Sequence, residues 1–156
     1  MKTNRILSCL MWHGNDDVVS KSLADVLLLA LRWFIAWQFL KAGLVKLDDW
    51  SSTLALFESE YQVPLLSPVL AAYLGTAGEL VFPILLMAGL FTRWAALGLF
   101  AVNAMAVISY PQLFTFDCPA AINDHKYWAV ILAVIFVFGA GRLSLDGFSG
   151  VKNIKQ

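Results

Sequence analysis

The stretch "YLGTAGELVFPILLMAGLFTR", from Tyr73 to Arg93, decides the class of fold. It is apolar almost throughout, and its length suits an α-helix across a bilayer core, which takes about 20 apolar residues. A glutamate, Glu79, nevertheless lies near its middle, and Pro83 follows one turn later. The sequence therefore predicts a membrane-spanning helix with a carboxylate inside it, and this charge requires a partner.

The rest of the chain is as apolar as this stretch. Of its 156 residues 60% are hydrophobic, whereas soluble domains contain about 45–50%. Segments of spanning length cover residues 23–45, 67–91, 94–110 and 127–145. Backbone amides in hydrocarbon must be bonded within the segment, and these runs lack the alternation of barrel strands. We expect an all-α integral membrane four-helix bundle with short loops, which forms a single domain over residues 1–156.

Two connections have their own patterns. Only Thr92 and Arg93 separate the second and third segments, which predicts a tight helical hairpin. The first outer loop contains "STLALFESEY", residues 52–61, which predicts a short interfacial helix with its apolar side chains on one face. Small residues that would let the helices approach closely are Gly43, Gly75, Gly78, Gly89, Gly98, Gly139 and Gly141.

The distribution of basic residues predicts the orientation. In a four-span chain both termini and the middle loop share one side, which holds Lys2, Arg5, Lys21, Arg93, Arg142, Lys152 and Lys155. The two opposite loops hold Lys41, Lys46 and Lys126 and are richer in Asp and Glu. By the positive-inside rule we expect a multi-pass protein of the bacterial inner (plasma) membrane with both termini in the cytoplasm.

Charge and cysteine content argue against other classes. The formal net charge of +0 gives no basic face for nucleic acid. Cys9 and Cys118 are far apart and form no C-x-x-C motif, and the two histidines are scattered, so we expect no metal site.

Three polar residues lie deep inside predicted spans. At 1.5 Å per residue Arg32, Glu79 and Asn103 lie roughly 14, 18 and 14 Å from the ends of their helices, which places all three near mid-membrane. An uncompensated charge at that depth costs at least about 2.5–3.5 kcal/mol. We therefore expect a buried ion pair between Arg32 and Glu79, with a further hydrogen bond from Asn103.

Two interpretations of this predicted pair remain open. In the structural one, it fixes which helix neighbours which. In the functional one, it binds the polar head of a ligand or relays a proton. Gln38 and Lys41, in the outer third of the first helix, are further candidate ligand contacts, although Lys41 can also snorkel outward.

Other polar residues have simpler explanations. His125 is expected at the start of the last helix, with Asn123 or Asp124 as its N-cap. Arg142 is expected to anchor the end of the last span at the membrane surface. Pro83 has no N–H and leaves the carbonyl of Glu79 without its helical hydrogen bond.

Two segments carry a family resemblance. "LRWFIAWQFLKAGLVKL" (31–47) and "GTAGELVFPILLMAGLFTRWAALGL" (75–99) resemble the DoxX family of small four-helix bacterial membrane proteins. The matching motif positions are Arg32, Gly43, Lys46, Glu79, Gly89 and Arg93. The family name comes from a subunit of an archaeal terminal quinol oxidase and thiosulfate:quinone oxidoreductase, and other members resemble partners in redox or thiol-stress complexes. The resemblance implies a membrane redox accessory, with quinone as the cofactor to consider and none bound covalently.

Three functions follow from these observations. The first is a membrane subunit or accessory of a quinone-linked or stress-related complex, which contacts lipid and a protein partner or a second copy of itself. The second is a quinone-binding oxidoreductase subunit with its own site at Arg32, Glu79 and Asn103. The third is a small oligomeric transporter. Because the chain has no haem-ligand pair and no flavin or iron–sulfur motif, electrons would come from a partner.

Overall fold

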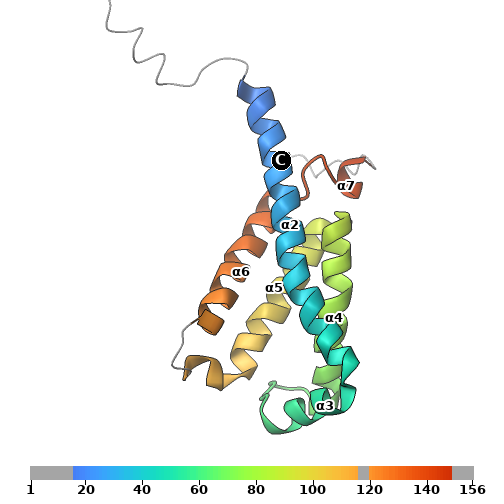
Figure 1. Ribbon diagram of the computed structural model, residues 1–156, viewed down its shortest axis with the longest axis vertical. Helices are drawn as coiled ribbons and strands as arrows, with labels where there is room; N and C mark the ends of the chain where they lie inside the picture. Colours follow the sequence, from blue (N-terminus) through green and yellow to red (C-terminus); the bar gives the residue numbers. More distant parts are fainter. Residues whose placement is uncertain (1–15, 116–119, 149–156) are drawn as a thin grey trace, which may run out of the picture.

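The computed structural model describes residues 16–115 and 120–148. Its helices, labelled as in Figure 1, are α2 (Asp16–Asp48), α3 (Trp50–Ser59), α4 (Pro68–Ala88), α5 (Thr92–Ser109), the 3₁₀-helix η1 (Pro111–Phe114), α6 (Ala120–Phe138) and α7 (Leu145–Phe148). Four of these helices, α2, α4, α5 and α6, are long and apolar enough to span a membrane. The prediction of an all-α four-helix membrane bundle is confirmed. Lys2, Arg5, Cys9, Cys118, Lys152 and Lys155 lie outside the described residues.

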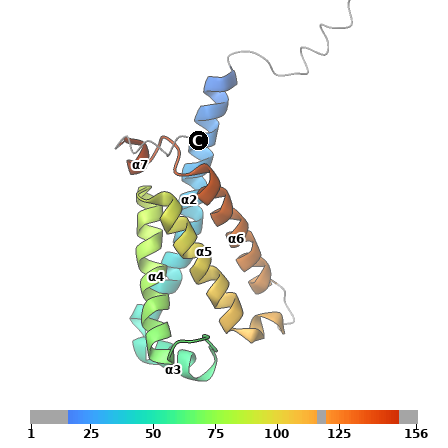
Figure 2. The ribbon, with the colours of Figure 1, turned by 180° about the vertical axis from the view of Figure 1, so that it is seen from behind.

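The four long helices form one bundle. α2 packs mainly on α4, and α5 packs on both α4 and α6. α3 lies across one end of the bundle, whereas α7 lies at the other end, beyond which the first turns of α2 extend (Figures 1 and 2). The shared core is apolar, with Ile35, Leu86, Leu99 and Leu132 fully buried. Large apolar side chains also cover the outer faces, as expected where lipid replaces water.

The turn between α4 and α5 begins earlier than predicted. α4 ends at Ala88, because Gly89 adopts the left-handed conformation (φ 68°) and caps the helix. A Cβ atom at Gly89 would lie 2.1 Å from Nη1 of Arg32, so glycine is required here by conformation and by space. The predicted second span, 67–91, is therefore too long. Thr92 and Arg93, predicted to form the turn, are the first residues of α5.

The boundaries predicted for the fourth span, 127–145, are wrong. α6 begins at Ala120 and ends at Phe138, so both ends are shifted by seven residues. His125 consequently lies in the second turn of the helix and not at its cap. Gly139 (φ 81°) and Gly141 (φ 71°) lie beyond the helix in left-handed conformations and form the turn after α6. Gly141 also lies close to α2, because a Cβ atom there would be 2.9 Å from Oδ1 of Asp25.

The predicted helix in the first outer loop is confirmed as α3. Asp49 caps it, because its carboxylate accepts hydrogen bonds from the backbone N–H of Ser52 (3.0 Å) and from the hydroxyl groups of Ser51 and Ser52. These bonds, chiefly those from Ser52, lower the pKa of Asp49 to about 2. Phe57 packs against Ala71 and Ala72 of α4. α3 thereby closes one end of the bundle.

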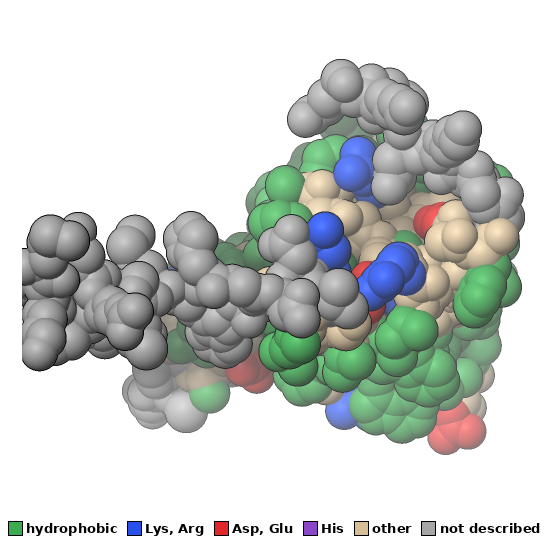
Figure 3. Space-filling view, turned by 90° about the horizontal axis from the view of Figure 1, so that it is seen from above, with side chains coloured by type: hydrophobic (Ala, Val, Ile, Leu, Met, Phe, Trp, Pro, Cys, Tyr) green, Lys and Arg blue, Asp and Glu red, His purple; other side chains and the backbone are tan. Residues whose placement is uncertain are grey.

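Residues 139–148 close the opposite end. The Asp146 carboxylate accepts hydrogen bonds from the backbone N–H groups of Phe91 (3.0 Å) and Thr92 (2.9 Å) at the start of α5. Arg142 was expected to anchor the last span, but it lies outside α6 and forms an ion pair with Asp25 of α2 (2.5 Å). Figure 3 looks onto this end, where Lys and Arg side chains gather with hydrophobic side chains around them.

Candidate functional site

The predicted ion pair between Arg32 and Glu79 is wrong, because each residue has other partners. Oε2 of Glu79 lies 2.5 Å from Nζ of Lys46. Arg32 is buried at the α7 end, where its guanidinium donates to the carbonyl oxygens of Leu143 (2.5 Å) and Leu86 (3.4 Å). Leu86 is seven residues beyond Glu79, or about 10 Å along α4. The first turns of α2 extend beyond the α7 end of the bundle (Figure 1), so a depth counted from Leu23 placed Arg32 too far into the bundle.

Asn103 also has a different partner from the one predicted. Its amide nitrogen donates to the carbonyl oxygen of His125 (2.9 Å), and its amide oxygen lies 2.7 Å from Nδ1 of the same histidine. Since an amide oxygen only accepts, this contact assigns the proton to Nδ1. Asn103 therefore joins α5 to α6 and does not bond to Glu79.

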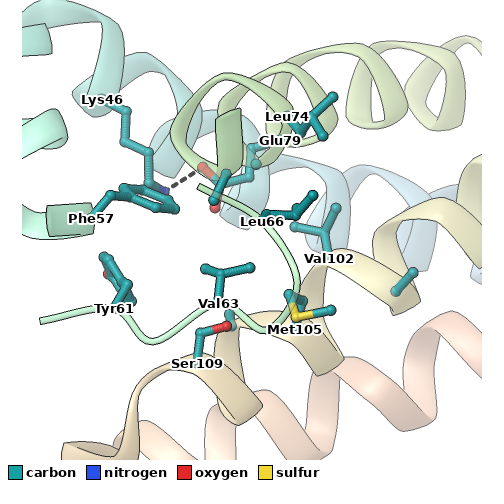
Figure 4. Close-up of a pocket in the computed structure, with 14 residues that line it drawn as sticks. Lys46, Phe57, Tyr61, Val63, Leu66, Leu74, Glu79, Val102, Met105 and Ser109 are labelled. Carbon is teal, nitrogen blue, oxygen red and sulfur yellow. Dashed lines mark hydrogen bonds and ion pairs between the residues drawn. The ribbon is translucent and has the colours of Figure 1, made fainter. Parts of the chain in front are cut away.

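The Lys46–Glu79 pair lies in the wall of a cavity. The cavity has a volume of about 230 Å³ and lies between α3, α4, α5 and the loop after α3 (Figure 4). Lys46 and Glu79 supply its charged groups, and most of the other side chains are apolar. The lining residues are Lys46, Phe57, Tyr61, Val63, Leu66, Ala71, Leu74, Gly75, Glu79, Ala101, Val102, Met105, Ala106 and Ser109.

Gly43 explains why Lys46 can reach Glu79. A Cβ atom at Gly43 would lie 2.9 Å from Cδ2 of Leu80 and 3.1 Å from Cβ of Glu79, so α2 and α4 approach closely at this point. Lys46 follows nearly one turn later. Side chains of a helix lean toward its N-terminus, and α2 and α4 run in opposite directions (Figure 1). The side chains of Lys46 and Glu79 therefore lean toward each other.

Two hydroxyl groups add polar character to the cavity. Burial raises the pKa of the Tyr61 hydroxyl above its usual value, and the negative charge of Glu79 raises it further, so Tyr61 keeps its proton. The hydroxyl oxygen of Ser109 is buried without a hydrogen-bond partner. An ammonium group, a carboxylate and two hydroxyl groups thus share one largely apolar cavity, which suits a ligand with a small polar head.

Only one of the predicted ligand-binding residues lines this cavity. Glu79 does, whereas Arg32, Asn103, Gln38 and Lys41 do not. Gln38 is within 3.5 Å of the carbonyl oxygen of Phe34 in its own helix, and Lys41 is exposed. Sequence reasoning missed Lys46 as a site residue because hydropathy ended the first span at Val45. The available signal was the DoxX resemblance, in which Lys46 is one of the matching motif positions.

The described residues also bear on metal binding. Within residues 16–115 and 120–148, no group of three or more His, Cys, Asp and Glu side chains lies together as a potential metal site. The polar side chains that line the cavity are those of Lys46, Glu79, Tyr61 and Ser109.

A comparison with protein families identifies the family of this chain. The DoxX family model matches residues 27–112, more than half of the chain. The chain belongs to the DoxX family. The matched DoxX region includes both residues of the ion pair and all the residues that line the cavity.

This DoxX protein is also similar to a known protein over most of its length. An uncharacterized protein of Haemophilus influenzae is 32% identical over 130 residues, which cover 79% of this chain and 83% of the relative. No solved structure matches the chain significantly. The similarity to this relative therefore covers most of both chains.

Proposed function

We propose that this DoxX-family protein is a membrane subunit of a quinone-linked redox complex, and that the cavity beside Lys46 and Glu79 holds the ring of a quinone. One observation carries the proposal: the part-buried ion pair faces a cavity and is not sealed between packed helices. A pair that only fixed the arrangement of helices would need no such space. This geometry favours a ligand-binding subunit over a purely structural anchor.

The cavity groups match the chemistry of a quinone ring. The ammonium group of Lys46 and the hydroxyl group of Tyr61 can donate hydrogen bonds to ring oxygens, which are acceptors. Glu79 can exchange a proton at the cavity wall. A bound quinone would supply the electron chemistry, which needs a carboxylate or a similar group because quinone reduction takes up protons together with electrons. The electrons would come from a partner protein.

The proposal is tested by the co-purification of quinone with matched variants. The protein would be isolated with native lipid in nanodiscs and its quinone content measured by extraction and mass spectrometry. Glu79→Gln and Lys46→Gln should each reduce bound quinone at least tenfold. Lys41→Gln is the matched control, because Lys41 is an exposed lysine of the same helix outside the cavity. This control should retain the quinone content of the wild type.

The opposite results have a definite meaning. A wild-type protein that carries no quinone from a quinone-containing membrane would contradict the proposal. Equal quinone content in all four proteins would show that the quinone binds elsewhere. A protein partner that co-purifies with the wild type and all three variants in the absence of quinone would identify the chain as an anchor, with the Lys46–Glu79 pair as a structural element.

A further inference from the structure

The shape of the cavity indicates how its ligand arrives. We infer that the cavity is filled from the lipid, through an opening between α4 and α5, by a molecule with a ring-sized polar head and an apolar tail. This inference rests on the proposed function, because it concerns the same cavity. It adds the route and the class of ligand: a resident of the membrane leaflet on the α3 side and not a solute from water.

α4 and α5 are closely packed from the turn between them to about their midpoints. A Cβ atom at Gly98 would lie 2.5 Å from Cζ of Phe82, and one at Gly78 would lie 2.8 Å from Cγ2 of Val102. Farther toward α3 the two helices diverge (Figure 2), and there their facing residues line the cavity. The space therefore opens in the half of the hairpin that is remote from its turn.

The opening has an exposed apolar rim. We use "portal" for the four exposed lining residues Leu66, Leu74, Ala101 and Met105. Leu74 of α4 is 55% exposed and Met105 of α5 is 39% exposed. Both belong to membrane-spanning helices, so a ligand at the portal meets lipid on one side and the cavity on the other. Apolar side chains at such a rim favour the passage of a hydrocarbon chain.

The side of the cavity toward α3 is covered instead. Phe57 of α3 is only 8% exposed, and its ring packs against the ring of Tyr61 with centroids 4.7 Å apart. The backbone N–H of Gln62 donates to the carbonyl oxygen of Ser109 (2.7 Å), which holds the loop after α3 on the end of α5. A solute that entered from water would have to displace this cover.

The volume of the cavity defines the shape of the ligand. At about 230 Å³ it is smaller than the pockets of roughly 300–1,000 Å³ that enclose a drug-sized molecule. A ring-sized head can lie beside Lys46 and Glu79, but an attached tail must leave through the portal into the membrane. A tail therefore adds contacts at the rim, and the protein should bind a tailed molecule more strongly than its head alone.

The experiment blocks the portal after folding. Leu74→Cys would be introduced together with Cys9→Ser and Cys118→Ser, reconstituted in nanodiscs and modified with a bulky hydrophobic methanethiosulfonate. Val130→Cys is the matched control, because Val130 is 63% exposed on α6 and does not line the cavity. The probes are a decyl-tailed benzoquinone and the same ring without a tail. Their binding would be followed by stopped-flow quenching of tryptophan fluorescence.

We expect modification at position 74 to slow association of the tailed probe at least tenfold, and modification at position 130 to leave the rate unchanged. Ala101→Trp, which narrows the portal from α5, should slow binding in the same way without a reagent. The unmodified protein should bind the tailed probe at least tenfold more tightly than the tail-free ring.

The failures of the two proposals are distinguishable. If the wild type binds the tailed probe and blocking the portal has no effect on its rate, lipid entry is wrong while the proposed function stands. Equal affinity for the tailed and tail-free probes would also overturn lipid entry. If the wild type binds neither probe, the proposed function is wrong and this inference fails with it.

Discussion

At the residue scale, the partner of Glu79 determines the chemistry of the site. An arginine would present a planar, rigid fork of N–H donors to the carboxylate. The partner in the structure is Lys46, whose ammonium group has three N–H donors on a flexible stem. Lys46 can therefore direct one donor to Glu79 and another into the cavity.

The strength of this pair can be measured with a double-mutant cycle. Glu79→Gln and Lys46→Gln should each destabilise the protein, because each leaves the other charge without a partner inside the bundle. The double variant should be less destabilised than the sum of the two singles, with an interaction free energy of about 1–3 kcal/mol. Reversible unfolding in mixed micelles would give the free energy of unfolding of the wild type, the two single variants and the double variant. Additive single effects would show that the two groups are not coupled.

Gly89 provides a second test at this scale. Gly89→Ala should lower the melting temperature, because alanine in a left-handed conformation costs about 1–2 kcal/mol and its Cβ would also collide with the Arg32 side chain. Gly75→Ala is the matched control: Gly75 lies inside α4, and a Cβ there would make only an ordinary contact of 3.6 Å with Phe57. Equal melting temperatures for wild type and Gly89→Ala would contradict the packing of Arg32 against the α4–α5 turn.

At the element scale, the sequence predicts the identity of the helices better than their ends. Lipid excludes other structures from long apolar segments, so hydropathy was sufficient to find α2, α4, α5 and α6. The start of α6 could not be predicted in this way, because the polar segment around His125 is helical and bonded to Asn103. Hydropathy also could not predict which polar side chains on different helices form pairs. The register of α2 against α4, which determines whether Glu79 meets Arg32 or Lys46, depends on the contact at Gly43.

The cap of α3 should respond to pH. The pKa of Asp49 is lowered from 3.8 to about 2 in the folded protein, so its contribution to stability is complete above the unfolded pKa and is lost as the pH falls through the folded pKa. Hydrogen exchange of the first turn of α3 should therefore show a loss of protection in wild type as the pH falls from 3.8 toward 2.

Asp49→Asn is the control for this titration. Its amide oxygen can still accept a hydrogen bond from the backbone of Ser52 but carries no charge to titrate. After correction for the intrinsic exchange rate, its protection should be independent of pH over the same interval. The same loss of protection in both proteins would show that Asp49 is not the titrating group.

At the scale of the whole molecule, the two ends of the bundle are built differently. The α7 end is joined by polar contacts between distant segments, such as those of Arg32 with Leu143 and of Asp25 with Arg142. The α3 end instead contains the cavity, under an apolar and aromatic cover. The proposed ligand would therefore enter or leave at the α3 end while the contacts that hold the α7 end together stay in place.

The orientation of these ends in the membrane would decide which leaflet supplies the proposed ligand. Lys21 lies in the first turns of α2, Arg93 at the start of α5 and Arg142 after α6, which are all at the α7 end. The positive-inside rule therefore predicts that this end faces the cytoplasm. Leu65, at the α3 end, and Phe148, in α7, are both exposed. After Cys9→Ser and Cys118→Ser, an impermeant maleimide applied to intact spheroplasts should modify Leu65→Cys at once and Phe148→Cys only after permeabilisation. The reverse pattern would place the portal in the cytoplasmic leaflet, and quinone probes would then have to be supplied from that side.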